Sequence, residues 1–195
     1  RFSRVVQTIT YIPHFISIVV VASMIKDFTM STGVINDIVA FFGGERVTML
    51  TKPGLFVPIY VISDIWQGVG WGTIIYLAAI TNVNSELYEA AKVDGANRWQ
   101  QCLHVTLPCI RSTIVVMLIM QLGKLMGGSF ERIVALSNAK ATEFTTTIPV
   151  LVYKWFQGNK FSESTALGLF QSVIGVILVI ASDRVAKKLG EDGLL

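Results

Sequence analysis

The chain has 195 residues, of which 52% are hydrophobic and only 15% are charged, and its mean hydropathy is +0.60. Soluble domains carry about 25% charged residues, so this composition argues against a water-facing surface and favours a membrane protein. The formal net charge of +3 is small and the basic residues are scattered, which argues against a nucleic-acid partner. The chain begins at Arg1 without Met or a signal-peptide pattern, so we expect an internal piece whose amino-terminal part is missing.

Four apolar segments approach or exceed the ~20 residues needed to cross a bilayer. They run roughly over residues 5–24, 54–80, 112–130 and 165–182. Each segment alone would also suit a buried helix of a soluble protein. Because four of them occur in a chain with so few charges, we predict an all-α, polytopic membrane helical bundle with four spans in this chain.

The segments between the spans set the expected topology. Residues 26–52 contain a small apolar patch, which predicts a short helix at the membrane interface. Residues 131–163 are expected to form a longer mixed loop, whose Trp and Tyr side chains favour the headgroup level. Basic residues flank the first span and follow the last, although others lie on the opposite side, and this pattern places both chain ends in the cytoplasm.

Residues 86–108 are the most polar stretch in the middle of the chain, and this topology makes them cytoplasmic. Ser85 is expected to cap a first helix whose opening turns carry two carboxylates, where the helix dipole favours anions. Gly95, after Asp94, is expected to end that helix in a left-handed turn. Pro108 fixes the backbone before the third span. Because small alanine side chains on one face let another protein approach closely, residues 85–108 are predicted to be a docking knob.

A family resemblance is carried by these same residues. The pattern YEAAKVDGA at residues 88–96, followed by Leu-Pro at residues 107–108, resembles the EAA loop of the membrane-spanning subunits of binding-protein-dependent ABC importers. More narrowly, the carbohydrate-importer permeases of the LplB type, which take up oligosaccharides or polysaccharide fragments, are similar at residues 11–22, 70–80 and 166–179.

The resemblance implies the type I permease fold and one half of a translocation pore, in a subunit of about six spans, two of them before Arg1. It also implies a second homologous permease subunit in a heterodimer, two ATP-binding subunits that hold ATP and Mg, and an extracytoplasmic solute-binding lipoprotein. The implied location is the bacterial plasma membrane. The residues implied to couple to the ATPase are Glu86, Glu89, Ala90, Ala91, Asp94, Gly95, Leu107 and Pro108.

Polar and aromatic residues within the expected spans are candidates for a substrate path, because a charge at mid-membrane costs ~2.5–3.5 kcal/mol on insertion scales. The candidates are Asp64, Trp66, Gln67, Trp71, Tyr76, Gln121 and Lys124. Three interpretations are open: Asp64 pairs with Lys124 across the bundle, the amides and aromatics line a sugar path, or these groups form structural hydrogen bonds between helices.

Nothing in the sequence predicts an enzyme. The glycines of residues 68–72 lack the Gly-Lys-Ser/Thr of a P-loop, so close helix packing is expected there. His14 and His104 lack further ligands at metal-binding spacing, and no Gly-x-Ser-x-Gly motif is present. Cys102 and Cys109 would lie about 10 Å apart on a helix, too far for a disulfide, so they are expected to be free thiols in a reducing compartment.

Other functions remain open at this point. The solute of an ABC importer of this kind need not be a sugar, and a peptide, an amino acid or a phosphate compound are alternatives. A passive channel or carrier would need no docking knob. A scaffold that moves no solute would have no need for Asp64 and Lys124 within its spans.

Overall fold

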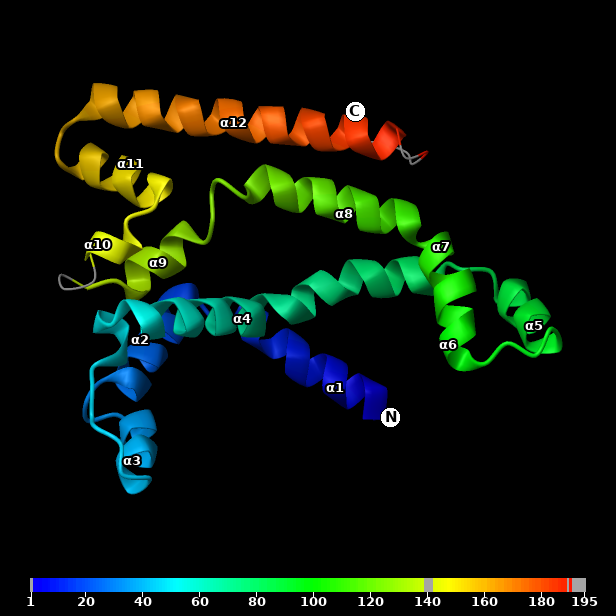
Figure 1. The fold of residues 1–195 in the computed structure, drawn as a ribbon, viewed down its shortest axis with the longest axis horizontal. Helices are drawn as coiled ribbons and strands as arrows, with labels where there is room; N and C mark the ends of the chain where they lie inside the picture. The colour runs from blue at the N-terminus through cyan, green and yellow to red at the C-terminus, as the bar shows by residue number, and fades with distance from the viewer. Residues whose placement is uncertain (1, 139–141, 189, 191–195) are drawn as a thin grey trace. The chain divides into compact units, whose positions relative to one another are not determined.

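The computed structural model describes residues 2–138, 142–188 and 190. These residues divide into two compact units: unit 1 holds residues 1–70 and 127–170, and unit 2 holds residues 71–126 and 171–195. Every regular element in the described ranges is a helix, which confirms the all-α prediction (Figure 1). The long helices α4 (Pro53–Thr81) and α12 (Phe161–Lys188) contribute residues to both units.

Unit 1 begins with a broken helix, in which α1 (Phe2–Tyr11) and the short η1 (Ile12–Phe15) are separated from α2 (Ile18–Thr29). The other elements of unit 1 are α3 (Val34–Phe41), η2 (Met49–Thr51), the first part of α4, α9 (Phe130–Leu136), α10 (Thr142–Thr145), α11 (Ile148–Gln157) and the start of α12. Ile16 has an extended backbone at the break, with φ −82° and ψ 133°. The Ser17 hydroxyl then starts α2 by accepting a hydrogen bond from the Val19 amide.

The core of unit 1 is a small apolar cluster in which α2, η2, α4 and α9 meet. Its buried members are Ala22, Leu50, Phe56 and Leu136. The Phe144 ring packs edge-on against Phe56, with their centroids 5.6 Å apart. This cluster holds α9 against α2 and α4, and so determines where the polar side chains of α9 lie.

One small residue lets α4 approach α1 closely. A Cβ atom on Gly70 would collide with the carbonyl oxygen of Thr10, whereas the Cβ positions of Gly68 and Gly72 are open. The prediction of close packing over residues 68–72 is therefore confirmed at one of its three glycines.

Unit 2 contains the polar middle of the chain and two longer helices. Its elements are the end of α4, α5 (Ser85–Val93), α6 (Arg98–Gln101), the π-helical η3 (Cys102–Thr106), α7 (Leu107–Cys109), α8 (Arg111–Lys124) and most of α12. A Cβ on Gly123 would lie 2.7 Å from Cγ2 of Val179, so α8 and α12 also approach closely at a glycine.

Two predictions about local structure were wrong. Residues 131–163 are not a mixed loop but carry α9, α10, α11 and the start of α12, because the apolar side chains of α9 pack against α2 and Pro149 starts α11. The cap of the first helix of the docking knob is Asn84 rather than Ser85. The short helix expected within residues 26–52 is present as α3.

The expected four spans differ in part from the helices observed. By length and composition, two described helical segments suit a membrane span, Ile18–Phe41 and Phe161–Lys188. A third would be the pair Arg98–Cys109 and Arg111–Lys124, which is bent by 65°. The 29 residues of α4 are long enough to span, but Asp64 and Gln67 interrupt its apolar run. The four-span count stays a prediction.

Candidate functional site

The docking knob, residues 85–108, is built from two short helices joined by a glycine turn. At its start, Oδ1 of Asn84 accepts a hydrogen bond of 3.0 Å from the Glu86 amide. At the end of α5, Gly95 has φ +80°. The Ala96 amide donates back to the carbonyl of Ala91 over 2.9 Å, as in a helix end with a left-handed residue. The predicted left-handed turn is therefore confirmed.

The second helix of the knob is tied to the first by a side-chain hydrogen bond. Asn97 and Gln100 form a capping box at the start of α6. The helix then widens into the π-helical η3, and the hydroxyls of Tyr88 on α5 and Thr106 on η3 lie 2.9 Å apart. This contact makes the knob a braced pair of helices, followed by the 65° bend into α8.

The surface of the knob combines carboxylates with exposed apolar side chains. Glu86, Glu89 and Asp94 are exposed. Val93, which was expected on the apolar face of the first knob helix, has 88% of its surface exposed, and Trp99, which the sequence did not single out, has 71% exposed. Exposed apolar groups beside charged ones are typical of protein–protein contact surfaces. The position of Trp99 shortly after the Asp-Gly-Ala turn was the sequence signal that could have identified it.

A cleft of about 310 Å³ lies between the two helices of the knob. Its lining residues are Ala91, Asp94, Gly95, Ala96, Gln100, His104 and Val105. Three of the predicted coupling residues, Ala91, Asp94 and Gly95, therefore share one concave surface. Such a cleft can receive a side chain of a partner protein.

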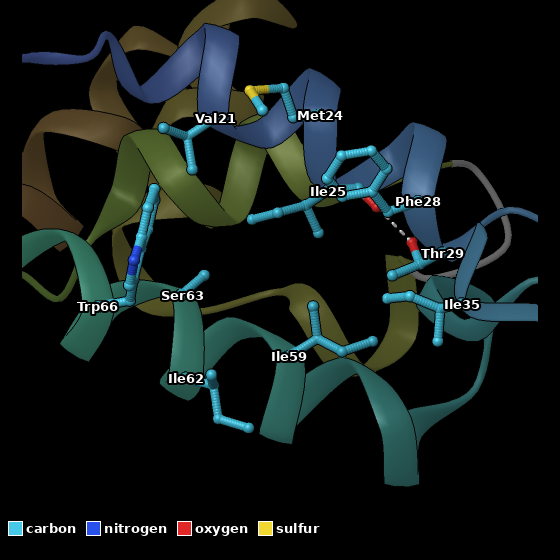
Figure 2. A pocket seen from close by; sticks show the side chains of 10 residues that line it. All are labelled: Val21, Met24, Ile25, Phe28, Thr29, Ile35, Ile59, Ile62, Ser63 and Trp66. Carbon is cyan, nitrogen blue, oxygen red and sulfur yellow. Dashed lines mark hydrogen bonds between the residues drawn. The ribbon is translucent and has the colours of Figure 1, made fainter. Parts of the chain in front are cut away.

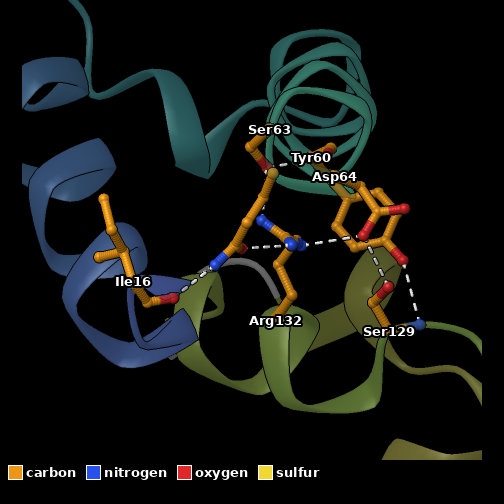
Figure 3. Close-up of polar contacts among 7 residues, drawn as sticks. Ile16, Tyr60, Ser63, Asp64, Ser129 and Arg132 are labelled. Atoms are coloured by element: carbon orange, nitrogen blue, oxygen red, sulfur yellow. Dashed lines mark hydrogen bonds and ion pairs between the residues drawn. The ribbon is translucent and has the colours of Figure 1, made fainter. Parts of the chain in front are cut away.

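A second cluster of polar groups lies inside unit 1, where α4 faces α9 (Figure 3). Oδ1 of Asp64 accepts hydrogen bonds from Oγ of Ser129 over 2.8 Å and from Nε of Arg132 over 3.1 Å. Arg132 also donates through Nη2 to Oε1 of Gln67 over 2.7 Å and through Nη1 to Oγ of Ser63 over 3.4 Å. The arginine of α9 is thus bound to three side chains on one face of α4.

Gln67 extends this cluster to the broken helix. Its Nε2 donates a 2.7 Å hydrogen bond to the carbonyl of Ile16, the residue where the helix between η1 and α2 is interrupted. On the other side, the hydroxyl of Tyr60 accepts a 3.4 Å bond from the Ser129 amide. The cluster therefore joins three segments that are far apart in sequence.

The two charged members of the cluster differ in burial. The Arg132 side chain is 5% exposed, whereas 46% of the Asp64 side chain is accessible. The uncharged Gln67 is also buried, at 5% exposure. Among the described residues, all protein hydrogen bonds of Asp64 go to its Oδ1, so its other oxygen is available as an acceptor. The buried arginine balances the carboxylate, and the carboxylate remains accessible.

The interpretation that Asp64 pairs with Lys124 was wrong, because the ion pair of Asp64 is with Arg132. Sequence reasoning missed Arg132 since it assigned residues 131–163 to a loop. The sequence signal was an arginine within the apolar run of Phe130–Leu136.

The other substrate-path candidates are not members of this hydrogen-bonded cluster. Trp66 lines an apolar groove of about 420 Å³ between α2 and α4, facing Val21 and Met24 (Figure 2). In unit 2, Trp71, Gln121 and Lys124 are exposed and Tyr76 is half-buried. Among the described residues, no group of three His, Cys, Asp or Glu side chains is placed to hold a metal ion.

Comparison with known families gives one match over nearly the whole chain. The family model described as "Binding-protein-dependent transport system inner membrane component" matches residues 1–190.

Among curated proteins, the chain is 46% identical over 195 residues to the polygalacturonan/rhamnogalacturonan transport system permease protein YteP of Bacillus subtilis (strain 168). It is 40% identical to the protein LplB of the same organism. In both cases the match covers 99% of this chain and 61% of the relative. The chain therefore spans about three fifths of the length of these relatives.

Two solved structures are similar in fold and sequence. A chain of a bacterial alginate ABC transporter, in complex with a periplasmic protein that holds an alginate pentasaccharide, superposes with a TM-score of 0.93. It is 40% identical, and the match covers 99% of this chain and 68% of that one. A second structure of a bacterial ABC transporter that imports the acidic polysaccharide alginate gives a TM-score of 0.91 at 41% identity, with 96% and 66% covered.

Proposed function

We propose, from the premise that this chain belongs to the family of inner membrane components of binding-protein-dependent transport systems, that it forms half of the translocation pore of an ABC importer for oligosaccharides or polysaccharide fragments. The observation that carries this proposal is the braced knob of residues 85–108, with an exposed carboxylate and apolar surface. A passive channel would have no use for such a docking surface.

The proposed assembly contains a second homologous permease subunit, as a heterodimer, two ATP-binding subunits and an extracytoplasmic solute-binding lipoprotein. ATP and Mg are held by the ATP-binding subunits, and this chain binds neither. The proposed location is the bacterial plasma membrane, with the knob in the cytoplasm. The similar alginate transporter, solved in complex with a periplasmic protein, supports the solute-binding protein of this assembly.

Coupling requires a rigid connection between the ATPase and the spans, so that a movement of the ATPase displaces the spans instead of deforming the knob. We propose that the ATPase receives the knob through Glu86, Glu89, Ala90, Ala91, Asp94 and Gly95. The hydroxyl contact between Tyr88 and Thr106 keeps the two knob helices together. Leu107 and Pro108 form α7 at the base of the knob, and a push on the knob is passed through the bend at Ile110 into α8.

The proposed substrates are acidic oligosaccharides, since one relative belongs to a polygalacturonan/rhamnogalacturonan transport system and a similar solved transporter is involved in the import of alginate. Sugars offer hydroxyl groups to polar acceptors and apolar ring faces to aromatics. The accessible oxygen of Asp64 and the half-exposed indole of Trp71 provide such groups. In this proposal Gln67 helps to position Arg132, the partner of Asp64, by accepting its hydrogen bond. The further candidates along the path are Trp66, Tyr76, Gln121 and Lys124.

The test is ATPase activity and uptake by the full complex, reconstituted in lipid with its binding protein, across a panel of neutral oligosaccharides, acidic oligosaccharides, peptides and amino acids. Stimulation by an acidic oligosaccharide is expected. Stimulation by a peptide or an amino acid alone would support the importer function but reject a sugar as its substrate. Uptake that proceeds without ATP would reject the importer in favour of a passive carrier.

A further inference from the structure

Arg132 is unusual among the basic side chains of residues 5–138 and 143–188. Within those ranges it is the one Lys or Arg that is buried, at 4% exposure. Burying a charge is costly unless the charge is paired and hydrogen-bonded. All three guanidinium nitrogens of Arg132 donate to α4, to Ser63, Asp64 and Gln67. The side chain is therefore fixed in direction as well as in place.

The pair with Asp64 is asymmetric, which a purely structural ion pair does not require. Arg132 already has two neutral acceptors, Ser63 and Gln67. The carboxylate is fixed through Oδ1 alone, while 46% of its side chain stays accessible. The result is an accessible carboxylate that can accept a hydrogen bond from a hydroxyl group, and that is paired with a buried positive charge.

That arrangement matters for an acidic solute. Two like charges that meet at short range in a medium less polar than water repel each other strongly. An Asp64 carboxylate without Arg132 would repel the carboxylates of a uronic-acid oligosaccharide. With Arg132 in place the pair is neutral, and Asp64 can still accept a hydrogen bond from a sugar hydroxyl.

We infer that Arg132 is a specificity-determining positioning residue: it cancels the charge of Asp64 so that uronate-bearing oligosaccharides can pass an acceptor that binds their hydroxyls. This inference rests on the proposed function, because it takes Asp64 to lie on the substrate path. It adds that the chain selects for acidic sugars through a buried cation that need not touch them.

The experiment compares two probes with the same sugar backbone, trigalacturonate, which carries a negative charge on each residue, and its fully methyl-esterified form, which carries none. Uptake of each is measured with the complete reconstituted complex, and the ratio of acid to ester is normalised to wild type. Because the same binding protein serves every variant, its own preference cancels in the normalised ratio. Arg132→Gln is expected to lower the ratio about tenfold, which corresponds to ~1.4 kcal/mol in the barrier.

The double variant D64N/R132Q removes both charges and is expected to restore the wild-type ratio. Arg132→Lys keeps the charge but loses the fork that binds three acceptors, so it should lower both uptakes while leaving the ratio unchanged. Arg46→Gln is the matched control, since Arg46 forms an exposed ion pair with Asp37 and its loss should not alter the ratio.

Two outcomes would overturn the inference while the transport function stands. In one, Arg132→Gln lowers the uptake of acid and ester equally. In the other, D64N/R132Q keeps a low ratio although it moves the ester well. If Arg132→Gln does not assemble, the lysine variant decides, because a lowered ratio with Lys would contradict charge compensation. A wild-type complex that is intact but moves neither probe would instead reject the acidic-sugar function itself.

Discussion

The docking knob and the polar cluster around Asp64 are both shaped by side-chain hydrogen bonds, but they draw on different stretches of chain. Among the side-chain hydrogen bonds within the knob, the one between Tyr88 and Thr106 joins the residues that are farthest apart in sequence, 18 positions. In the cluster, Arg132 binds side chains of α4 that are 65 to 69 residues away, and Gln67 binds the Ile16 carbonyl across 51 residues. The knob can therefore keep its shape while it moves, whereas the cluster exists only when unit 1 is folded.

The largest effect is expected from Gly95→Pro, because proline cannot adopt the left-handed backbone conformation of the turn. Proline holds φ near about −65°, while Gly95 has φ +80° and its amide donates to the carbonyl of Lys92. The knob should lose its shape, and ATP-driven uptake should fall by more than about tenfold, or ~1.4 kcal/mol. Uptake by reconstituted vesicles measures this.

The control at the same position is Gly95→Asn, because Asn tolerates left-handed backbone angles and there is open space around the Gly95 Cβ position. This variant should retain most of the uptake. Normal uptake with proline at this position would refute the coupling role of the turn.

The next largest effect is expected from Glu89→Lys. Glu89 is exposed on α5, so charge reversal should leave the melting temperature of the chain nearly unchanged but weaken assembly with the ATPase about tenfold, or ~1.4 kcal/mol. Co-purification with the ATP-binding subunits measures the assembly. Glu89→Gln should fall between wild type and the lysine variant, and full assembly of the lysine variant would remove Glu89 from the contact.

In the cluster, Gln67→Leu should destabilise unit 1 by about 1–3 kcal/mol, because it leaves the Ile16 carbonyl and one Arg132 donor without their partner. Thermal unfolding of the purified complex in detergent measures the loss. Gln121→Leu is the matched control for stability, since Gln121 is exposed on α8. Equal melting temperatures for the two variants would mean that the cluster does not hold unit 1 together.

The smallest effect is expected from Tyr88→Phe, which removes only the hydroxyl contact with Thr106. The loss should be about 0.5–1.5 kcal/mol, confined to the knob. Hydrogen exchange should therefore quicken at the amides of α5 and α6 and stay unchanged in α9. Faster exchange in α9 as well would show that the knob and unit 1 unfold together, and would weaken the contrast between the two regions.

This contrast also explains what could be predicted from the sequence. The turn at Gly95 follows from the conformational preference of one residue, and the apolar runs that became α4 and α12 are visible as composition. The cluster could not be found in this way, because Arg132 reaches Asp64 only after α9 has packed on α2 and α4. Without that packing, Lys124 was as plausible a partner for Asp64, and Arg132 looked like a loop residue.

The break in the first helix bears on how tightly the proposed pore can be sealed. Where a helix is interrupted inside hydrocarbon, its unsatisfied carbonyl groups attract water unless another group binds them. Gln67 provides that bond at Ile16. A transporter in an energised membrane has to keep ions from leaking between its helices. In the proposed transporter, with residues 5–24 as the predicted first span, the amide that steadies Arg132 would also keep water from entering at the break, and Gln67 variants should make resting vesicles more permeable to protons even when no sugar is present.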